Sequence, residues 1–208
     1  MKKSFILTFL FGLVLFFSAC SGCTSKEEPV VTDPDTTIVV NKIIKEDFDS
    51  MFNKYGKEEF RFYETDILLK NFLDEENDGN IAELVNIYQV ATELDSTSFD
   101  TYVYKVQHFS NGTVLKDSVN GFWIENYPIT LDEIKVPYDS AYNLMLRVNL
   151  PKPHSRHVTL RKPMGPLDCN TQWIFGNIHQ QIWIDAVTGE AKSSNPAFPN
   201  DFEYAFNW

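Results

Sequence analysis

Apolar residues between positions 44 and 55 recur every three or four residues, which is the spacing of one face of an α-helix. These positions are Ile44, Phe48, Met51, Phe52 and Tyr55. Gly56 follows directly, and glycine commonly ends a helix. The pattern predicts a helix over about 45–55.

The next part of the chain is rich in aromatic and β-branched side chains, which favour strands. The segments with this character are 60–73, 81–93, 99–109 and 114–124. The spacing within 81–93 is also compatible with a helix. Asn111-Gly112 separates the last two segments and is the strongest short signal for a hairpin. We therefore expect a four-stranded meander after the first helix.

After residue 128 the pattern restarts with a second helix. Pro137 and Asp139 suit a helix start, and Pro151 and Pro153 end the helical pattern. The apolar positions between them share one helical face and are Ala141, Leu144, Met145 and Val148. Three short strands are then predicted at 157–162, 171–177 and 180–187.

The order of helix and strands, followed again by helix and strands, predicts an α+β fold. The links are short, so we expect an antiparallel sheet with one or two helices packed on one face. The folded chain divides into a first part at 40–127 and a second at 128–208. Aromatic residues alternate from Phe202 onward and suit a last edge strand or, if exposed, a partner surface. A degenerate tandem helix–meander repeat is an open alternative, because no residue identity between the two parts is visible.

The first 20 residues have a different pattern. Two lysines precede an apolar run at 5–17, and Ser18 and Ala19 precede Cys20. A basic start, a short apolar run and small residues before a cleavage point are typical of an export signal. The run of 13 residues is too short for a membrane-spanning helix, which needs roughly 20 apolar residues.

The residues before Cys20 resemble the lipobox of bacterial lipoproteins, with Phe17, Ser18 and Ala19 in the preceding positions. The resemblance implies that residues 1–19 are a lipoprotein signal peptide and that Cys20 is lipidated. Several acyl chains on one cysteine give stable anchoring. Residues 20–39 are rich in Pro, Ser, Thr and acidic residues, so we expect them to form a flexible tether.

The tether contains Lys26-Glu27-Glu28, which resembles a surface-export signal of some Gram-negative bacteria. We therefore expect an outer-membrane lipoprotein that lies on the periplasmic face or at the cell surface. The cysteine content agrees with an exported protein that has no disulfide framework. The alternative is a Cys23–Cys169 bridge, which would pin the flexible tether, so these two cysteines are expected to be free thiols.

Charge limits the partners that the chain can bind. The chain has 18 Lys and Arg against 29 Asp and Glu, a formal net charge of −11 at pH 7. Removal of residues 1–19 takes away Lys2 and Lys3 and no acidic residue, so the charge becomes −13. Nucleic acid binding needs a positive surface, so nucleic acid is excluded as a partner. The expected link to the membrane is the lipid on Cys20.

Acidic residues from Asp74 to Asp78, followed by Gly79, resemble the first half of a calcium-binding EF-hand loop. If Asp74 is position 1 of such a loop, position 12 is Val85, where the loop requires a bidentate Glu. The missing carboxylate favours a plain acidic turn over a calcium site.

Other candidate chemistry is equally incomplete. His154 and His157 stand beside Pro153, whereas a zinc site needs three or four ligands. Cys169 has no base that the sequence places beside it. No G-x-S-x-G nucleophile motif occurs in the chain. We therefore expect no catalytic residue, no metal site and no cofactor.

Two segments of the second part resemble PepSY and PepSY-like domains over about 128–192. Residues 129–133, Ile-Thr-Leu-Asp-Glu before a helix, resemble the opening of such domains, and residues 182–191 resemble their closing strand and turn. The chemistry of the closing turn is readable by itself. Asp185 and Thr188 can bond the backbone of the turn, and Gly189 can take a positive φ. We interpret these three residues as a structural turn.

PepSY-like domains occur beside peptidases and in exported proteins, where an inhibitory or binding role has been proposed for them. The resemblance therefore implies an envelope-anchored, non-catalytic lipoprotein that binds or inhibits an envelope protein or peptidase. The alternative is a glycan-binding accessory surface lipoprotein. Its support is the location and the tryptophans at 123, 173, 183 and 208.

Overall fold

The computed structural model of the chain describes residues 38–194, except for 57–59, 76–78, 96–97 and 165–169. Within these residues the helices are α1 (Val40–Tyr55) and α2 (Tyr138–Arg147), with one 3-10 turn, η1 (Leu131–Glu133). The strands are β1 (Phe60–Leu69), β2 (Ile81–Asp95), β3 (Ser98–Phe109), β4 (Val114–Asn120), β5 (Asn126–Tyr127), β6 (His157–Pro163), β7 (Gln172–Asn177), β8 (Gln180–Asp185) and β9 (Ala191–Ser194).

All the strands belong to one antiparallel sheet, in the order β4-β3-β2-β1-β6-β7-β8-β9, with β5 paired to β6 outside this path. Strands β1 to β4 form one meander and β6 to β9 form a second. The two meanders join where β1 pairs with β6, from Glu64 opposite Arg161 to Leu68 opposite His157. Each meander follows one helix, so the predicted α+β fold with an antiparallel sheet is confirmed.

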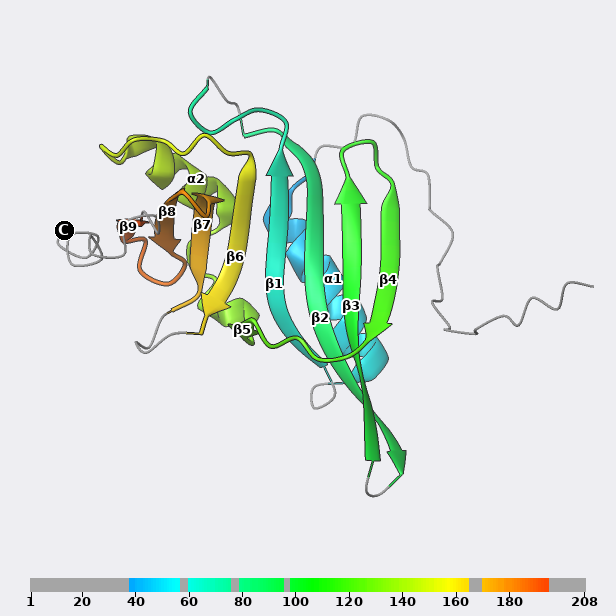
Figure 1. Cartoon of the computed structure of the whole chain (residues 1–208). Helices are drawn as coiled ribbons and strands as arrows, with labels where there is room; N and C mark the ends of the chain where they lie inside the picture. Colours follow the sequence, from blue (N-terminus) through cyan, green and yellow to red (C-terminus); the bar gives the residue numbers. More distant parts are fainter. Residues whose placement is uncertain (1–37, 57–59, 76–78, 96–97, 165–169, 195–208) are drawn as a thin grey trace, which may run out of the picture.

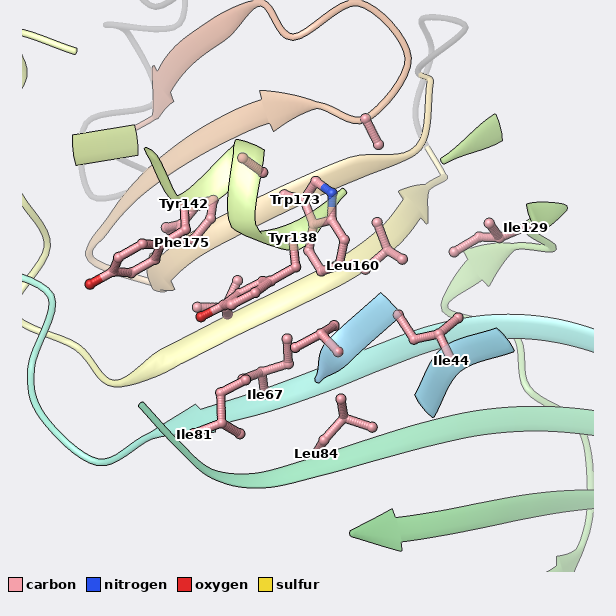
Figure 2. Packing of buried hydrophobic residues seen from close by; sticks show 14 of the residues in the cluster. Ile44, Ile67, Ile81, Leu84, Ile129, Tyr138, Tyr142, Leu160, Trp173 and Phe175 are labelled. Carbon is pink, nitrogen blue, oxygen red and sulfur yellow. The ribbon is translucent and has the colours of Figure 1, made fainter. Parts of the chain in front are cut away.

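Both helices cover the same face of this sheet (Figure 1). Helix α1 packs on the first meander, where the ring of Phe48 lies 5.0 Å from that of Phe60. Helix α2 packs on the second, where the ring of Tyr138 lies 5.6 Å from that of Trp173. Figure 2 shows Tyr138 and Trp173 beside Leu160, in a core that continues to the residues beneath α1. The opposite face of the sheet, which we call the open face, carries no helix.

Helix α1 begins at Val40, five residues before the predicted start at 45. Val40 and Ile44 are buried in the core, so the first turn is held by packing. The preceding Val39 makes no side-chain capping bond. The sequence therefore offers no cap at the true start, and the prediction placed it too late.

Helix α2 lies within the predicted segment, but its buried face differs from the predicted one. Its buried residues are Tyr138, Ala141, Tyr142 and Met145. Leu144 and Val148 are only partly buried at the edge of the core. The prediction was wrong in part because tyrosine was not counted as apolar, although its ring buries well against other aromatic rings. The ammonium of Lys152 donates to the carbonyls of Met145 and Val148 and satisfies the end of the helix.

Segment 81–95 is a strand along its whole length, so the helical alternative for 81–93 was wrong. β2 pairs with β1 on one side and with β3 on the other, and these pairings override the local spacing. Beyond Val90 and Tyr102, β2 and β3 continue as a two-stranded arm that projects past their neighbours (Figure 1).

Several predicted strands are shorter in the structure, and the strands β5 and β9 were missed. β1 ends at Leu69 and not at residue 73, and β4 ends at Asn120 and not at residue 124. The fourth strand of the second meander is β9, which has only 4 residues and no strong pattern. The aromatic tail, where an edge strand was expected, lies outside the described residues.

Neither of the helices in the described ranges has the length and apolar character that crossing a bilayer requires.

Candidate functional site

Polar side chains form a row across the centre of the open face. Glu64 of β1, Arg161 of β6, Gln172 of β7 and Asp185 of β8 stand opposite one another in the strand register. Directly paired residues of an antiparallel sheet point to the same face. Their neighbour Trp173 contacts α2, so the row points away from the helices.

Glu64 is the most perturbed carboxyl group of this row. Its side chain is buried, with 6% exposure, and its Oε2 accepts a hydrogen bond from Asn126 Nδ2. Burial is the main cause that raises the pKa of Glu64 to about 8, and the charge of Asp66 and a hydrogen bond to it raise this pKa further. The Asn126 bond and the charge of Arg161 act in the opposite direction. Near neutral pH this buried carboxyl group therefore carries a proton.

Residues 121–128 run from the end of β4 toward η1, cross the open face and reach Glu64 of this row; we call them the connector (Figure 1). Gly121 opens the connector at φ +149°, and its N–H donates to Thr101 O at 2.8 Å. The backbone N–H of Trp123 donates to Gln89 Oε1 at 2.8 Å. At the far end, Asn126 contacts Glu64 as described and its strand β5 pairs with β6. The connector is thus held to β3, β2, β1 and β6 in turn.

The connector also exposes large apolar side chains. Phe122 is 72% exposed and Ile124 is 76% exposed. Tyr127 is about half exposed, as is Val119, which lies in β4 just before the connector. We call these four residues the apolar patch. Val119 stands opposite Val103, whose neighbour Tyr104 contacts Tyr55 of α1, so this part of the patch belongs to the open face.

A second polar group lies on the helix side of the sheet. Asp47 of α1 accepts hydrogen bonds from Asn86 Nδ2 at 2.6 Å and from His108 Nε2 at 2.8 Å. Thr65 Oγ1 donates to Asn86 Oδ1 at 2.7 Å. One helix carboxylate thereby bonds groups of β2 and β3 directly and β1 through Asn86. The arrangement fixes the position of α1 on the first meander.

The predicted turn residues lie together in the link between β8 and β9. Asp185 Oδ1 accepts the N–H groups of Val187 and Thr188 at 2.8 and 2.9 Å. Thr188 Oγ1 accepts the N–H of Glu190, and Gly189 has φ +80°. Despite burial, these backbone bonds together with Asn170 and Gln172 lower the pKa of Asp185. The hydrogen bonds that the Asp185 side chain accepts come from the backbone of its own turn and from the side-chain amides of Asn170 and Gln172.

The opening segment of the second part also serves the packing of its own half. Glu133 of η1 accepts a hydrogen bond from Thr171 Oγ1 at 2.7 Å and pairs with Lys162 at 3.1 Å. Nearby, Trp173 Nε1 donates to Val136 O at 2.8 Å. The segment that joins the connector to α2 is thus attached to β6 and β7 by these bonds.

The histidines that the sequence singled out are not brought together as ligands of one site. His154 stacks on Phe72, with ring centroids 4.2 Å apart, and its Nδ1 lies 3.0 Å from Asp74. His157 begins β6 opposite Leu68. In the described part of the chain, no group of three or more His, Cys, Asp or Glu side chains is placed to hold a metal ion.

Residues 76–78 of the acidic turn lie outside the described residues, as do Cys20, Cys23 and Cys169. Val85, which would be the last ligand position of a calcium loop, lies within β2 opposite Asp66.

The tryptophans do not form one exposed platform. Trp173 is fully buried in the core. Trp183 is half-buried and donates to Gln181 Oε1 at 2.8 Å. Trp123 is half-buried within the connector, and Trp208 lies outside the described residues. A sugar platform would need an exposed aromatic face, so this arrangement gives it little surface.

Sequence reasoning did not identify Glu64, Asn126 or the connector as a site. The signal for Glu64 was its position two residues before Asp66, which places two carboxyl groups on one face of β1. The partner amide is 62 residues away, and local patterns give no information about such a contact.

Comparisons of this chain with protein-family models, with curated proteins and with solved structures find no match.

Proposed function

We propose that this chain is an envelope-anchored lipoprotein that binds another protein through its open face and has no catalytic activity of its own. The single observation that carries the proposal is the apolar patch on the connector. The lipobox-like residues before Cys20 support the anchoring, and the PepSY-like segments support a binding or peptidase-inhibitory role.

The patch gathers exposed apolar side chains on one short segment of the chain. Nine large hydrophobic side chains are exposed among the described residues, and four of them lie within 119–127. Scattered exposed hydrophobics are ordinary in a folded protein, whereas a contiguous group marks an interaction surface. Aromatic residues such as Phe122 and Tyr127 also carry much of the binding energy in protein interfaces.

The sheet beneath the patch provides a rigid support. The connector is bonded to Gln89 and Glu64, and Ile129, just beyond it, donates its N–H to Phe62 O at 2.7 Å. The acidic mature chain, with a net charge of −13, favours a partner with a basic surface around its own apolar contact.

The proposal is tested by capture of the partner in the bacterial host. The Phe122→Ser/Ile124→Ser double variant removes the two most exposed side chains of the patch. Ile178→Ser is the matched control, because Ile178 is 74% exposed and lies in the turn between β7 and β8. After chemical cross-linking in intact cells, we expect wild type and the control to retain a shared envelope partner that the double variant loses.

Recovery of the same proteins with all three chains, or of no specific protein with any of them, would contradict protein binding through this patch. If the captured partner is a peptidase, titration with the purified chain should lower its activity, and unchanged turnover would restrict the role to binding. Binding to a glycan array that is lost in Trp183→Ala and kept in the patch variant would instead support the glycan-binding alternative.

A further inference from the structure

Three buried side-chain atoms in and beneath the connector have no hydrogen-bond partner within the described ranges. They are Trp123 Nε1, Asn126 Oδ1 and Arg161 Nε. Among the described residues only Tyr88 Oη and Tyr138 Oη share this property, and both belong to the helix side of the sheet. A buried polar atom without a partner costs about 1–3 kcal/mol. The unfavourable polar burial of the open face is therefore concentrated at the connector.

The three atoms belong to one region of that face. Asn126 is 4% exposed, and its Nδ2 contacts Glu64, so its Oδ1 lies beside the same carboxyl group. Arg161 stands directly opposite Glu64 in the strand register. Trp123 lies three residues before Asn126, and its backbone N–H donates to Gln89 of β2. Two unsatisfied N–H donors and one unsatisfied acceptor thus lie in the connector and in β6, the strand with which the connector pairs.

This set of groups matches the main chain of an extended peptide. An extended chain presents alternating C=O acceptors and N–H donors, and peptide recognition modules obtain affinity from main-chain bonds of this kind. Phe122 and Ile124 are the exposed sequence neighbours of Trp123 and suit the apolar side chains of such a peptide.

We propose that the connector recognises an extended segment of the partner protein, whose carbonyl groups accept from Trp123 Nε1 and Arg161 Nε and whose N–H donates to Asn126 Oδ1. The inference rests on the proposed protein-binding function and names the chemistry of the partner. Since the three atoms are buried in the free protein, the connector shifts when the peptide binds, and the bonds it gains drive that shift.

Variants that lack these atoms distinguish an effect on peptide binding from an effect on the stability of the free protein. Trp123→Phe removes the indole N–H and keeps an aromatic ring, and Arg161→Met removes the guanidinium and keeps the aliphatic stem. Both changes relieve an unsatisfied buried group, so the free protein should be equally or more stable. Trp173→Phe is the matched control, because Trp173 Nε1 donates to Val136 O and its loss leaves that carbonyl without its bond.

The experiment selects peptides of about 12 residues from a random display library on the wild-type chain starting at Ser21, and measures the affinity of one synthetic peptide by calorimetry. We expect Trp123→Phe and Arg161→Met to bind this peptide at least roughly tenfold more weakly, and Trp173→Phe to bind it as wild type does. Methylation of single backbone nitrogens of the peptide should lower its affinity at one position, the one that donates to Asn126.

Three results would overturn the inference. One is that the library yields no peptide with a dissociation constant below about 100 μM. Another is that the peptide binds both connector variants with unchanged affinity. The third is that both variants lose as much stability in urea as Trp173→Phe, which would show that ordered water already satisfies the atoms. In each of these cases the capture of a partner through Phe122 and Ile124 still decides the proposed function separately.

Discussion

The side-chain amide of Asn126 donates to the carboxyl group of Glu64 across 62 residues of sequence, and both side chains are buried. This one contact fixes the connector to the central strand of the sheet. It also places an ionisable group under the surface that we propose for binding, so the stability of this region depends on pH.

Stability should fall as pH rises through the range in which Glu64 loses its proton. The pKa of Glu64 is about 8 in the folded chain, whereas the ordinary value for a glutamate side chain is 4.5. Between these values the folded state binds more protons than the unfolded state, so the free energy of unfolding decreases with pH. The stabilisation is complete below the lower value and is lost as pH passes the upper one.

Urea melts of wild type and Glu64→Gln at pH 5, 7 and 9 measure this effect. We expect wild type to lose on the order of 2 kcal/mol more than the variant between the lowest and the highest pH. Glu125→Gln changes an exposed carboxyl group of the connector and is the control, which should follow wild type. Parallel pH profiles of wild type and Glu64→Gln would show that Glu64 titrates normally.

The buried face of α2 predicts an ordered series of stability losses. Met145 is fully buried, Leu144 is partly buried and Asn143 is exposed. Met145→Ala should cost about 2–4 kcal/mol, Leu144→Ala about 1–2, and Asn143→Ala less than about 0.5. Urea midpoints at constant slope give the three values. A larger loss for Leu144→Ala than for Met145→Ala would restore the helix face that the spacing of the sequence predicted.

Gly189→Val should destabilise the turn after β8 through its backbone. Gly189 has φ +80°, a region in which a β-branched residue is strained. An added Cβ would lie 3.5 Å from Leu144 and 3.7 Å from Val136, which are ordinary contacts, so space is not the cause. We expect a loss of about 1–2 kcal/mol, measured as a lower melting temperature. Gly189→Asn should lose less, because asparagine tolerates positive φ, and equal losses would argue against backbone strain.

Asn86→Leu should break the polar group that holds α1. The buried Thr65 Oγ1 would lose its partner, and the half-buried Asp47 Oδ2 would lose one of its two partners. The expected cost is about 2–4 kcal/mol, whereas Asn53→Leu at an exposed position of α1 should change stability by less than about 0.5. Chemical denaturation of the two variants, followed by far-UV circular dichroism, compares them. Equal stabilities would mean that packing alone positions the helix.

Cys20→Ser should abolish lipid attachment. The small residues Ser18 and Ala19 before Cys20 motivate this prediction, because processing places the acyl chains on the cysteine that follows them. Metabolic labelling with a fatty-acid analogue in the host, followed by fractionation, should show loss of label and release from membranes. Cys23→Ser should keep both, and label that is lost in Cys23→Ser but retained in Cys20→Ser would reverse the assignment.

The order of elements could be predicted from the sequence because it depends on local patterns. The Asn111-Gly112 hairpin joins β3 and β4 as expected, and the apolar run before Gly56 lies within α1. The extent of β2 could not be predicted, since its length follows from pairing with β1 and β3 on both sides. The burial of Tyr138 and Tyr142 likewise depends on which rings meet them in the core.

The candidate site was beyond local patterns for the same reason. Residues 121–128 contain no regular spacing, and nothing within them indicates that they cross a sheet. The pKa of Glu64 depends on burial beneath a segment that the chain reaches about sixty residues later. Only Asp185, Thr188 and Gly189 could be placed in a turn beforehand, because their bonds are formed with residues next to them in sequence.

The pairing of β1 with β6 has a consequence for the order in which the sheet forms during synthesis of the chain. Asp66 of β1 and its hydrogen-bond partner Thr159 are 93 residues apart, so β1 is an edge strand until the chain has emerged as far as β6. An unpaired edge is where a partly folded chain associates with others. The carboxyl groups of Glu64 and Asp66 stand on that temporary edge, and charged groups there disfavour pairing with the wrong strand. The same two acids that end up at the centre of the finished sheet thus protect it against aggregation while only its first half exists.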